Sequence, residues 1–169
     1  MRKILEDLYF GNIVPYEKRI AADAELRHLV KRAADCESRL AEQLGLKRLW
    51  VKDDGQNPTA SLKDRASAMA VAKALEAGAD VIACSSTGNA ASSLAGNAAA
   101  AGLSTYIFVP SRPPKGKVAQ LMTFGATVIS VQGSYEETFE LSKAAIEKWG
   151  WYNRNAAINP YLSEGKKTV

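Results

Sequence analysis

From Gly45 onward, apolar runs of strand length alternate with alanine-rich or amphipathic stretches of helix length, and this alternation restricts the fold more than any other feature. The predicted strands cover residues 47–52, 81–84, 105–109, 127–131 and 151–155, and the predicted helices cover residues 63–78, 89–102, 115–124 and 135–149. Strands joined by helices of this length pair in parallel through right-handed crossovers. The pattern therefore predicts an α/β fold with a parallel sheet and helices on both faces.

Residues at the ends of these stretches agree with the boundaries. Gly78 and Gly125 follow predicted helices, and glycine readily takes the backbone conformation that ends a helix. Ser134 precedes the helix at residues 135–149 and is a suitable N-cap.

The first forty residues differ in character from the rest. Charged residues and leucines recur at helical spacing over residues 21–44, with Gly45 as the predicted end, and residues 3–10 form a second short predicted helix. We therefore predict a helical N-terminal segment at residues 1–39 and a separate domain at residues 40–169.

Composition excludes several classes of protein. Hydrophobic residues make up 47% of the chain and charged residues 24%, as in globular proteins, and the net charge of +4 is spread out rather than gathered on a basic face, which argues against nucleic-acid binding. Two cysteines without a CxxC pair and a single histidine do not form a disulfide framework or a metal site. The N-terminus lacks the features of a signal peptide, and the alanine-rich tract at residues 90–103 is too short and too polar to span a bilayer, so we expect a cytoplasmic protein that binds no membrane.

In a parallel α/β sheet, ligands bind beyond the carboxyl ends of the strands, so the loop Ser-Ser-Thr-Gly-Asn at residues 85–89 is the first candidate site. The loop follows a predicted strand and opens a helix, where free backbone N–H groups and the helix dipole favour an anion. A simple helix N-cap is the alternative, although capping needs only one such residue.

The segment Asn-Pro-Thr-Ala-Ser-Leu-Lys-Asp-Arg at residues 57–65 is the second candidate. Asn57 and Pro58 indicate a turn, and Ser61 can cap the next helix, which places Lys63 in its first turn. A cation there opposes the helix dipole, so the position does not favour lysine for helix stability. A desolvated lysine amine can act as a nucleophile or form a Schiff base, whereas an ordinary solvated lysine is the alternative.

Three further cations are weaker candidates. Lys115 and Lys117 lie in a loop-like segment, and Arg154 follows the last predicted strand. They can neutralise an anionic substrate, although a solvated loop is the alternative for the two lysines.

Together, these segments resemble threonine synthase, a pyridoxal-phosphate enzyme of the tryptophan-synthase-β fold type (fold type II). The similar segments are LGLKRLWVKDDGQNPTASLKDRAS (44–67), SSTGNAASSLA (85–95), FVPS (108–111), KVAQLMTFGATVISVQGSYEET (117–138) and YNRNAAINPYLSEGKKT (152–168). The resemblance runs from about Leu40 to the end of the chain.

The resemblance implies a cofactor and roles for individual residues. Lys63 would form the Schiff base with pyridoxal 5'-phosphate, and Asn89 would contact the phenolic oxygen of the cofactor ring. The pocket for the substrate carboxylate would be lined by Ser86, Thr87, Gly88 and Ala90. The substrate O-phospho-L-homoserine would lose phosphate and add water to give L-threonine, a lyase reaction of threonine biosynthesis, and Lys115, Lys117 and Arg154 are the candidates that would bind its phosphate.

Other features depart from the family pattern. Members of the family are about twice as long, and residues 1–39 instead resemble small uncharacterised bacterial helical proteins with similar KILEDLYFGNI wording. We therefore expect a truncated or fused enzyme, which would be a homo-oligomer if complete. The alternatives are a related fold-type-II enzyme, such as a threonine dehydratase or a cysteine synthase-like protein, and an inactive module.

Overall fold

The computed structural model describes residues 38–50 and 53–167. The described residues fall into two compact units: residues 38–50 and 53 belong to the smaller unit, and residues 54–167 belong to the larger one. Each unit is described by itself below. The predicted division between residues 39 and 40 stays a prediction.

A four-stranded parallel sheet forms the centre of the larger unit. Its strands are β1 (Val81–Ser85), β2 (Ser104–Pro110), β3 (Thr127–Val131) and β4 (Tyr152–Asn153), in the order β3-β2-β1-β4. Ala83 of β1 pairs with Tyr106 of β2 on one side and with Asn153 of β4 on the other. The order shows that the chain adds β2 and β3 on one side of β1 and then returns to place β4 on the other side.

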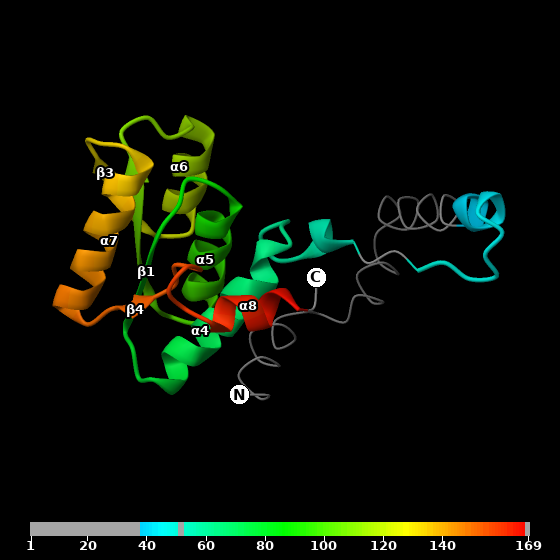
Figure 1. Cartoon of the computed structure of the whole chain (residues 1–169), viewed down its shortest axis with the longest axis horizontal. Coiled ribbons are helices and arrows are strands. Elements are labelled where there is room, and N and C mark those ends of the chain that lie inside the picture. The colour runs from blue at the N-terminus through cyan, green and yellow to red at the C-terminus, as the bar shows by residue number, and fades with distance from the viewer. Residues whose placement is uncertain (1–37, 51–52, 168–169) are drawn as a thin grey trace. The chain divides into compact units, whose positions relative to one another are not determined.

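Helices cover both faces of this sheet. The element order is η1 (Asp54–Gln56), α4 (Lys63–Glu76), α5 (Asn89–Ala100), α6 (Lys115–Thr123), α7 (Tyr135–Trp149) and α8 (Tyr161–Lys166), with the strands between them. Figure 1 shows α7 on one side of the strands and α5 and α6 on the other. α7 contacts β1, β2 and β4, whereas α5 contacts β1 and β2 and also packs against α4 and α6. The predicted fold class is confirmed.

Small side chains allow the layers to pack closely. α4 and α5 bury mainly alanines, among them Ala66, Ala70, Ala91 and Ala95, around the larger Leu94. Helices whose contact faces are alanine approach one another closely, which brings the backbone of α4 near α5. The same closeness holds for α8: a Cβ atom on Gly165 would lie 2.7 Å from the Cα atom of Ala66.

Several predicted helix ends are confirmed. Gly78 and Gly125 follow α4 and α6 with φ of +69° and +79°, and Gly150 ends α7 in the same left-handed region. The Ser134 side chain accepts a hydrogen bond from the Glu137 N–H, and the Glu137 carboxylate accepts one from the Ser134 N–H, which completes a capping box.

The described part of the smaller unit is short. Residues 38–43 are helical, and Gly45 follows them with φ of +65°. This agrees with the end of the helix predicted at residues 21–44, while the remainder of that helix and the helix at residues 3–10 lie outside the described residues. The strand predicted at residues 47–52 is wrong over residues 47–50, because these residues pair with no strand in the part of the chain that the structure describes. No described helix is long and apolar enough to cross a membrane.

Candidate functional site

The edge of the sheet at the carboxyl ends of β1 and β4, called the crevice from here on, is the topological switch point of the fold. After β1, the chain adds β2 and β3 on one side of β1 and then returns to add β4 on its other side. The strand order reverses between β1 and β4, and open α/β sheets bind ligands at such a switch point. The loop of residues 86–88 follows β1, and residues 154–160 follow β4. Both loops therefore lie at one edge of the sheet, and they contain the predicted site residues Ser86, Thr87, Gly88 and Arg154.

The loop after β1 presents donors to this edge. Ser86, Thr87 and Gly88 are half-buried, and the Gly88 N–H donates to the Ser86 hydroxyl at 3.3 Å. α5 begins at Asn89, and the main-chain N–H groups of Asn89 and Ala90 have no partner among the residues that the structure describes. Free amides at a helix N-terminus bind anions, so this position suits a carboxylate.

A chain of hydrogen bonds connects this helix start to α6. The Lys117 ammonium donates to the Asn89 Oδ1 atom at 2.7 Å and to the Gln120 Oε1 atom at 3.4 Å. The Ser92 hydroxyl also donates to Gln120 Oε1, at 2.9 Å. The structure thus brings together two predicted site residues, Asn89 and Lys117, through a direct contact.

Lys63 is the first residue of α4 and is half-buried. The helix starts one residue later than a Ser61 cap predicts: Leu62 is the N-cap residue, and the Ser61 hydroxyl accepts a hydrogen bond from the Lys63 main-chain N–H at 3.1 Å. The Lys63 ammonium has no hydrogen-bond or ion-pair partner within the described part of the chain. It is therefore available to a ligand.

The two residues after Lys63 have structural roles instead. Arg65 forms a salt bridge with Asp54 at 2.7 Å, and Asp64 is fully buried. The Asp64 carboxylate accepts hydrogen bonds from the Thr59 N–H at 2.8 Å, from the Thr59 hydroxyl at 2.7 Å and from the Asn97 amide at 3.0 Å. These three donors compensate the cost of burying the charge, and they fasten the loop before Lys63 to α5.

This loop contains a strained residue. Ala60 has φ of +54°, a left-handed conformation that is uncommon for residues with a side chain. The Asn57 amide donates to the Ser61 carbonyl at 3.0 Å and helps to hold the turn. Strain of this kind persists where surrounding contacts enforce it, and it occurs often at functional sites.

Arg154 lies just beyond β4 and is buried, with 5% of its surface exposed. Its Nη2 atom donates to the Ser67 hydroxyl at 3.2 Å, and its Nε atom has no partner among the described residues. Ser67 lies four residues after Lys63, so the two share one face of α4 and Arg154 lies beside that face. Burial lowers the pKa of the Arg154 guanidinium, and the neighbouring Cys84 opposes this shift. No described carboxylate neutralises Arg154, which makes it a candidate for binding an anion.

Asn155 connects the two strand ends at the crevice. Its Oδ1 atom accepts a hydrogen bond from the Ser85 N–H at 2.9 Å, and its Nδ2 atom donates to the Ser142 hydroxyl of α7 at 3.4 Å. No local sequence pattern predicts these two contacts, because the partners of Asn155 are 70 and 13 residues away. The same holds for Asn97 and Gln120, whose contacts follow only from the packing of α5 on α4 and on α6.

Other predicted site residues are not brought together. Lys115 is exposed at the start of α6, and among the described residues no hydrogen bond or ion pair joins Lys63 to Asn89 or to the loop of residues 86–88. The roles predicted for these residues therefore stay predictions. Among the described residues, no group of three or more histidine, cysteine, aspartate or glutamate side chains is arranged to hold a metal ion.

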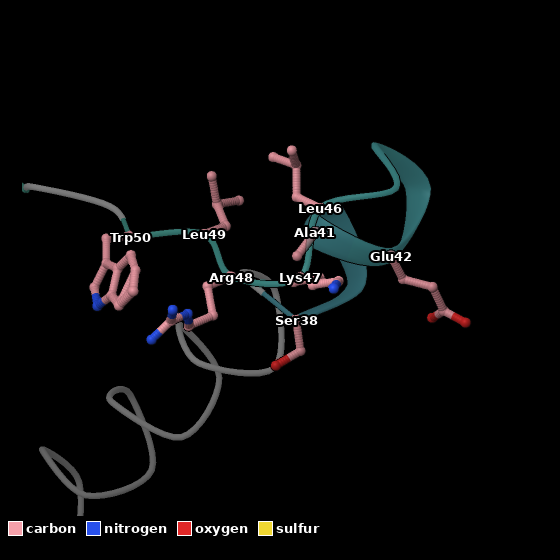
Figure 2. Close-up of a pocket in the computed structure, with 8 residues that line it drawn as sticks. All are labelled: Ser38, Ala41, Glu42, Leu46, Lys47, Arg48, Leu49 and Trp50. Atoms are coloured by element: carbon pink, nitrogen blue, oxygen red, sulfur yellow. The ribbon is translucent and has the colours of Figure 1, made fainter.

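A separate hollow lies in the smaller unit and contains none of the predicted site residues. Figure 2 shows its lining, which includes the exposed Trp50 and the neighbouring Arg48. The guanidinium carbon of Arg48 lies 5.5 Å from the centroid of the Trp50 ring. Four of its eight lining residues are polar or charged: Ser38, Glu42, Lys47 and Arg48.

Two family models match the chain. Residues 37–169 match a family described as pyridoxal-phosphate dependent enzyme, and residues 1–50 match a family of unknown function (DUF6809). The first match covers every predicted site residue and confirms the resemblance on which the cofactor prediction rests.

Curated relatives include several threonine synthases. The chain is 42% identical over 132 residues to threonine synthase from Methanosarcina acetivorans, and 40% identical over 131 residues to threonine synthase from Methanocaldococcus jannaschii. These matches cover 78% and 77% of this chain, but 32% of each relative. The chain thus spans about a third of the length of these relatives.

Solved structures with the same fold are also enzymes. A hydrogen sulfide-producing enzyme from Fusobacterium nucleatum superposes with a TM-score of 0.63 at 25% identity, over 68% of this chain and 37% of that one. O-ureido-L-serine synthase gives 0.61 at 24% identity, over 65% and 37%. Diaminopropionate ammonia lyase from Escherichia coli gives 0.61 at 18% identity, over 77% and 40%. These likenesses show the fold.

The residues at the crevice fit two parts of pyridoxal phosphate. An aldehyde needs an amine, and the Lys63 ammonium has no partner among the described residues; a phenolic oxygen needs a donor, and the Asn89 amide has an Nδ2 group with no partner in the same range. The donor set therefore suits the reactive end of the cofactor.

Proposed function

Because the chain belongs to the pyridoxal-phosphate dependent enzyme family, we propose that it carries the lysine-bearing part of a threonine synthase-like enzyme. The proposed reaction converts O-phospho-L-homoserine and water to L-threonine and phosphate. The identity of about 40% to threonine synthases supports this substrate, although the chain covers 32% of the length of those relatives.

The contacts of three adjacent residues carry this proposal. Asp64 and Arg65 are both held by protein partners, whereas the Lys63 ammonium between the loop and α4 has none among the described residues. The loop before Lys63 is strained at Ala60 and held by hydrogen bonds that do not involve the lysine amine. The amine is therefore available to bind an external group.

The other residues would bind and orient the substrate. The substrate carboxylate would be bound by the hydroxyls of Ser86 and Thr87 and by the main-chain amides at the start of α5. Gly88 and Ala90 would line the same pocket. Asn89 would donate to the phenolic oxygen of the cofactor, and Lys115, Lys117 and Arg154 would bind the substrate phosphate. The bound cofactor supplies an electron sink, and the Lys63 Nζ atom would hold and move the proton between substrate carbons.

Chemical trapping tests the role of Lys63. The purified full chain is mixed with pyridoxal phosphate, reduced with borohydride, digested and mapped by mass spectrometry. We expect the adduct on Lys63, its loss in Lys63→Ala, and its retention in the control Lys143→Ala on α7. A wild-type chain without an adduct on Lys63, or an equal total adduct in Lys63→Ala, would contradict the proposal.

A related fold-type-II activity is the second candidate, and the solved structures of an ammonia lyase and of two other enzymes of this fold favour it. The two candidates differ in their products. A threonine synthase-like enzyme releases phosphate from O-phospho-L-homoserine, whereas a threonine dehydratase releases ammonia from threonine. Parallel assays of phosphate and ammonia release by the chain with pyridoxal phosphate bound distinguish the two candidates.

We also propose that residues 1–39 and 40–169 are two modules of different origin, located together in the cytoplasm. The matches of residues 1–50 and 37–169 to two separate families support this division. A complete enzyme of this kind would be a homo-oligomer. Light scattering on the purified chain tests self-association, and a monomer that binds the cofactor would contradict the homo-oligomer.

A further inference from the structure

The Lys117 side chain does more than add positive charge near the crevice. Lys117 lies in the first turn of α6, where a cation opposes the helix dipole, so helix stability does not explain it. Its ammonium instead reaches across to α5 and meets the Asn89 side chain at 2.7 Å, a short distance typical of charge-assisted hydrogen bonds.

This contact decides which end of the Asn89 amide faces outward. A carboxamide has an acceptor oxygen at one end and a donor NH₂ group at the other, whereas an ammonium has only donors. The atom that meets Lys117 is therefore the oxygen, and the Nδ2 group is left to donate to a ligand. We propose that Lys117 is a positioning residue that holds the Asn89 amide with its donor end toward the phenolic oxygen of the cofactor.

The contacts around Lys117 support this role. The ammonium also donates to Gln120 Oε1 at 3.4 Å, and the Ser92 hydroxyl donates to the same oxygen at 2.9 Å. Gln120 is one turn from Lys117 on α6, and Ser92 is one turn from Asn89 on α5. The lysine is thereby held between two oxygens on facing helices, which restricts its motion more than a single surface contact would.

The consequence for the cofactor rests on the proposed function. If Lys117 were lost, the Asn89 amide could rotate and present either end, so that an acceptor would face the phenolic oxygen part of the time. Loss of one hydrogen bond to the ring is expected to weaken cofactor binding by about fivefold. Arginine, which also has only donors, is expected to preserve the orientation.

The first measurement needs no cofactor. The full chain is labelled with ¹⁵N, and the side-chain amide resonances of Asn89, assigned from their loss in Asn89→Ser, are compared in Lys117→Met, Lys117→Arg and the control Lys143→Met. We expect Lys117→Met to shift these resonances, Lys117→Arg to leave them near their wild-type positions, and Lys143→Met to leave them unchanged. Main-chain spectra show whether each variant is folded.

The second measurement is the dissociation constant of pyridoxal phosphate for the same variants, expected to rise about fivefold in Lys117→Met and to stay within about twofold of wild type in Lys117→Arg. Unchanged Asn89 resonances in Lys117→Met, or a shift of equal size in Lys117→Arg, would overturn the proposal. If the wild-type chain takes up no cofactor, the proposed function fails, and the amide resonances alone then decide the role of Lys117.

Discussion

Cys84 and Arg154 lie close together in the core beneath the crevice, and each affects the ionisation of the other. Burial raises the pKa of the Cys84 thiol from about 9.0 to about 11, while the positive charge of Arg154 opposes part of this rise. Only 1% of the Cys84 surface is exposed. The thiol is therefore a core group in its neutral form, with no catalytic role to explain.

This shift predicts a dependence of stability on pH. Below about pH 9 the thiol is protonated in both the folded and the unfolded chain, so the full stability is present. Between about pH 9 and 11 the unfolded thiol ionises first, which lowers the free energy of unfolding by about 2–3 kcal/mol. Urea unfolding across this range should show a smaller decrease for Cys84→Ala, and equal slopes in the two proteins would contradict the prediction.

The segment around Lys63 shows which properties of single residues can be predicted from the sequence. The position of Lys63 in the first turn of a helix followed from Pro58, Ser61 and the alanine-rich run. The role of Asp64 did not, because its partner Asn97 lies 33 residues away on another helix. Local patterns predict where a side chain lies along its helix, whereas the contacts that bury it depend on how the helices pack.

At the scale of elements, α8 illustrates a helix that its own sequence does not favour. It has six residues, and Gly165 inside it weakens a helix. It forms because it packs on α4, where the Gly165 position faces the backbone: a Cβ atom there would lie 2.7 Å from both the Ala66 Cα atom and the Arg65 carbonyl oxygen. Because Gly165 has no side chain, α8 and α4 can pack in direct contact at this position.

We therefore expect Gly165→Ala to destabilise the fold by about 1–3 kcal/mol, because backbone atoms of α4 cannot move aside as a flexible side chain can. Gly116→Ala in α6 is the matched control. A Cβ atom there has open space, and alanine favours a helix, so the control should be neutral or stabilising. Chemical denaturation of the two variants measures the difference, and a Gly165→Ala protein as stable as the control would show that α8 adjusts freely.

The predicted elements agree with the structure where a run of residues is both long and buried. The strands predicted at residues 81–84, 105–109 and 127–131 match β1, β2 and β3 to within one residue at each end. Two predictions differ from the structure for the same reason, which is that tertiary contacts decide the outcome. The segment KRLWVK (47–52) has the apolar content of a strand, but no strand lies beside its described residues. α8 lacks the sequence pattern of a helix, but it forms because it packs against α4.

At the scale of the whole molecule, the return of the chain to β1 depends on few contacts. β4 has only two residues, so its hydrogen-bonded ladder with β1 is short. Asn155 extends the connection: its side chain accepts from the Ser85 N–H and donates to Ser142 of α7, and the Arg154 N–H donates to the Ala83 carbonyl at 2.9 Å. The contacts with Ser85 and Ala83 join segments 70 or more residues apart and hold the ends of β1 and β4 together.

Asn155→Leu, which fills a similar volume without polar atoms, should lower the free energy of unfolding by about 2–3 kcal/mol, because it leaves the buried Ser85 N–H without an acceptor. Ser142→Ala removes this 3.4 Å contact and the 2.7 Å hydrogen bond that the Ser142 hydroxyl donates to the Phe139 carbonyl, and it should cost about 1 kcal/mol. Urea unfolding is followed by circular dichroism and by tryptophan fluorescence in a Trp50→Phe background, so that Trp149 and Trp151 report on the larger unit. Both probes should shift together, since residues 54–167 belong to one compact unit. Separate transitions in Asn155→Leu, or a loss no greater than in Ser142→Ala, would show that β4 is held by its ladder rather than by Asn155.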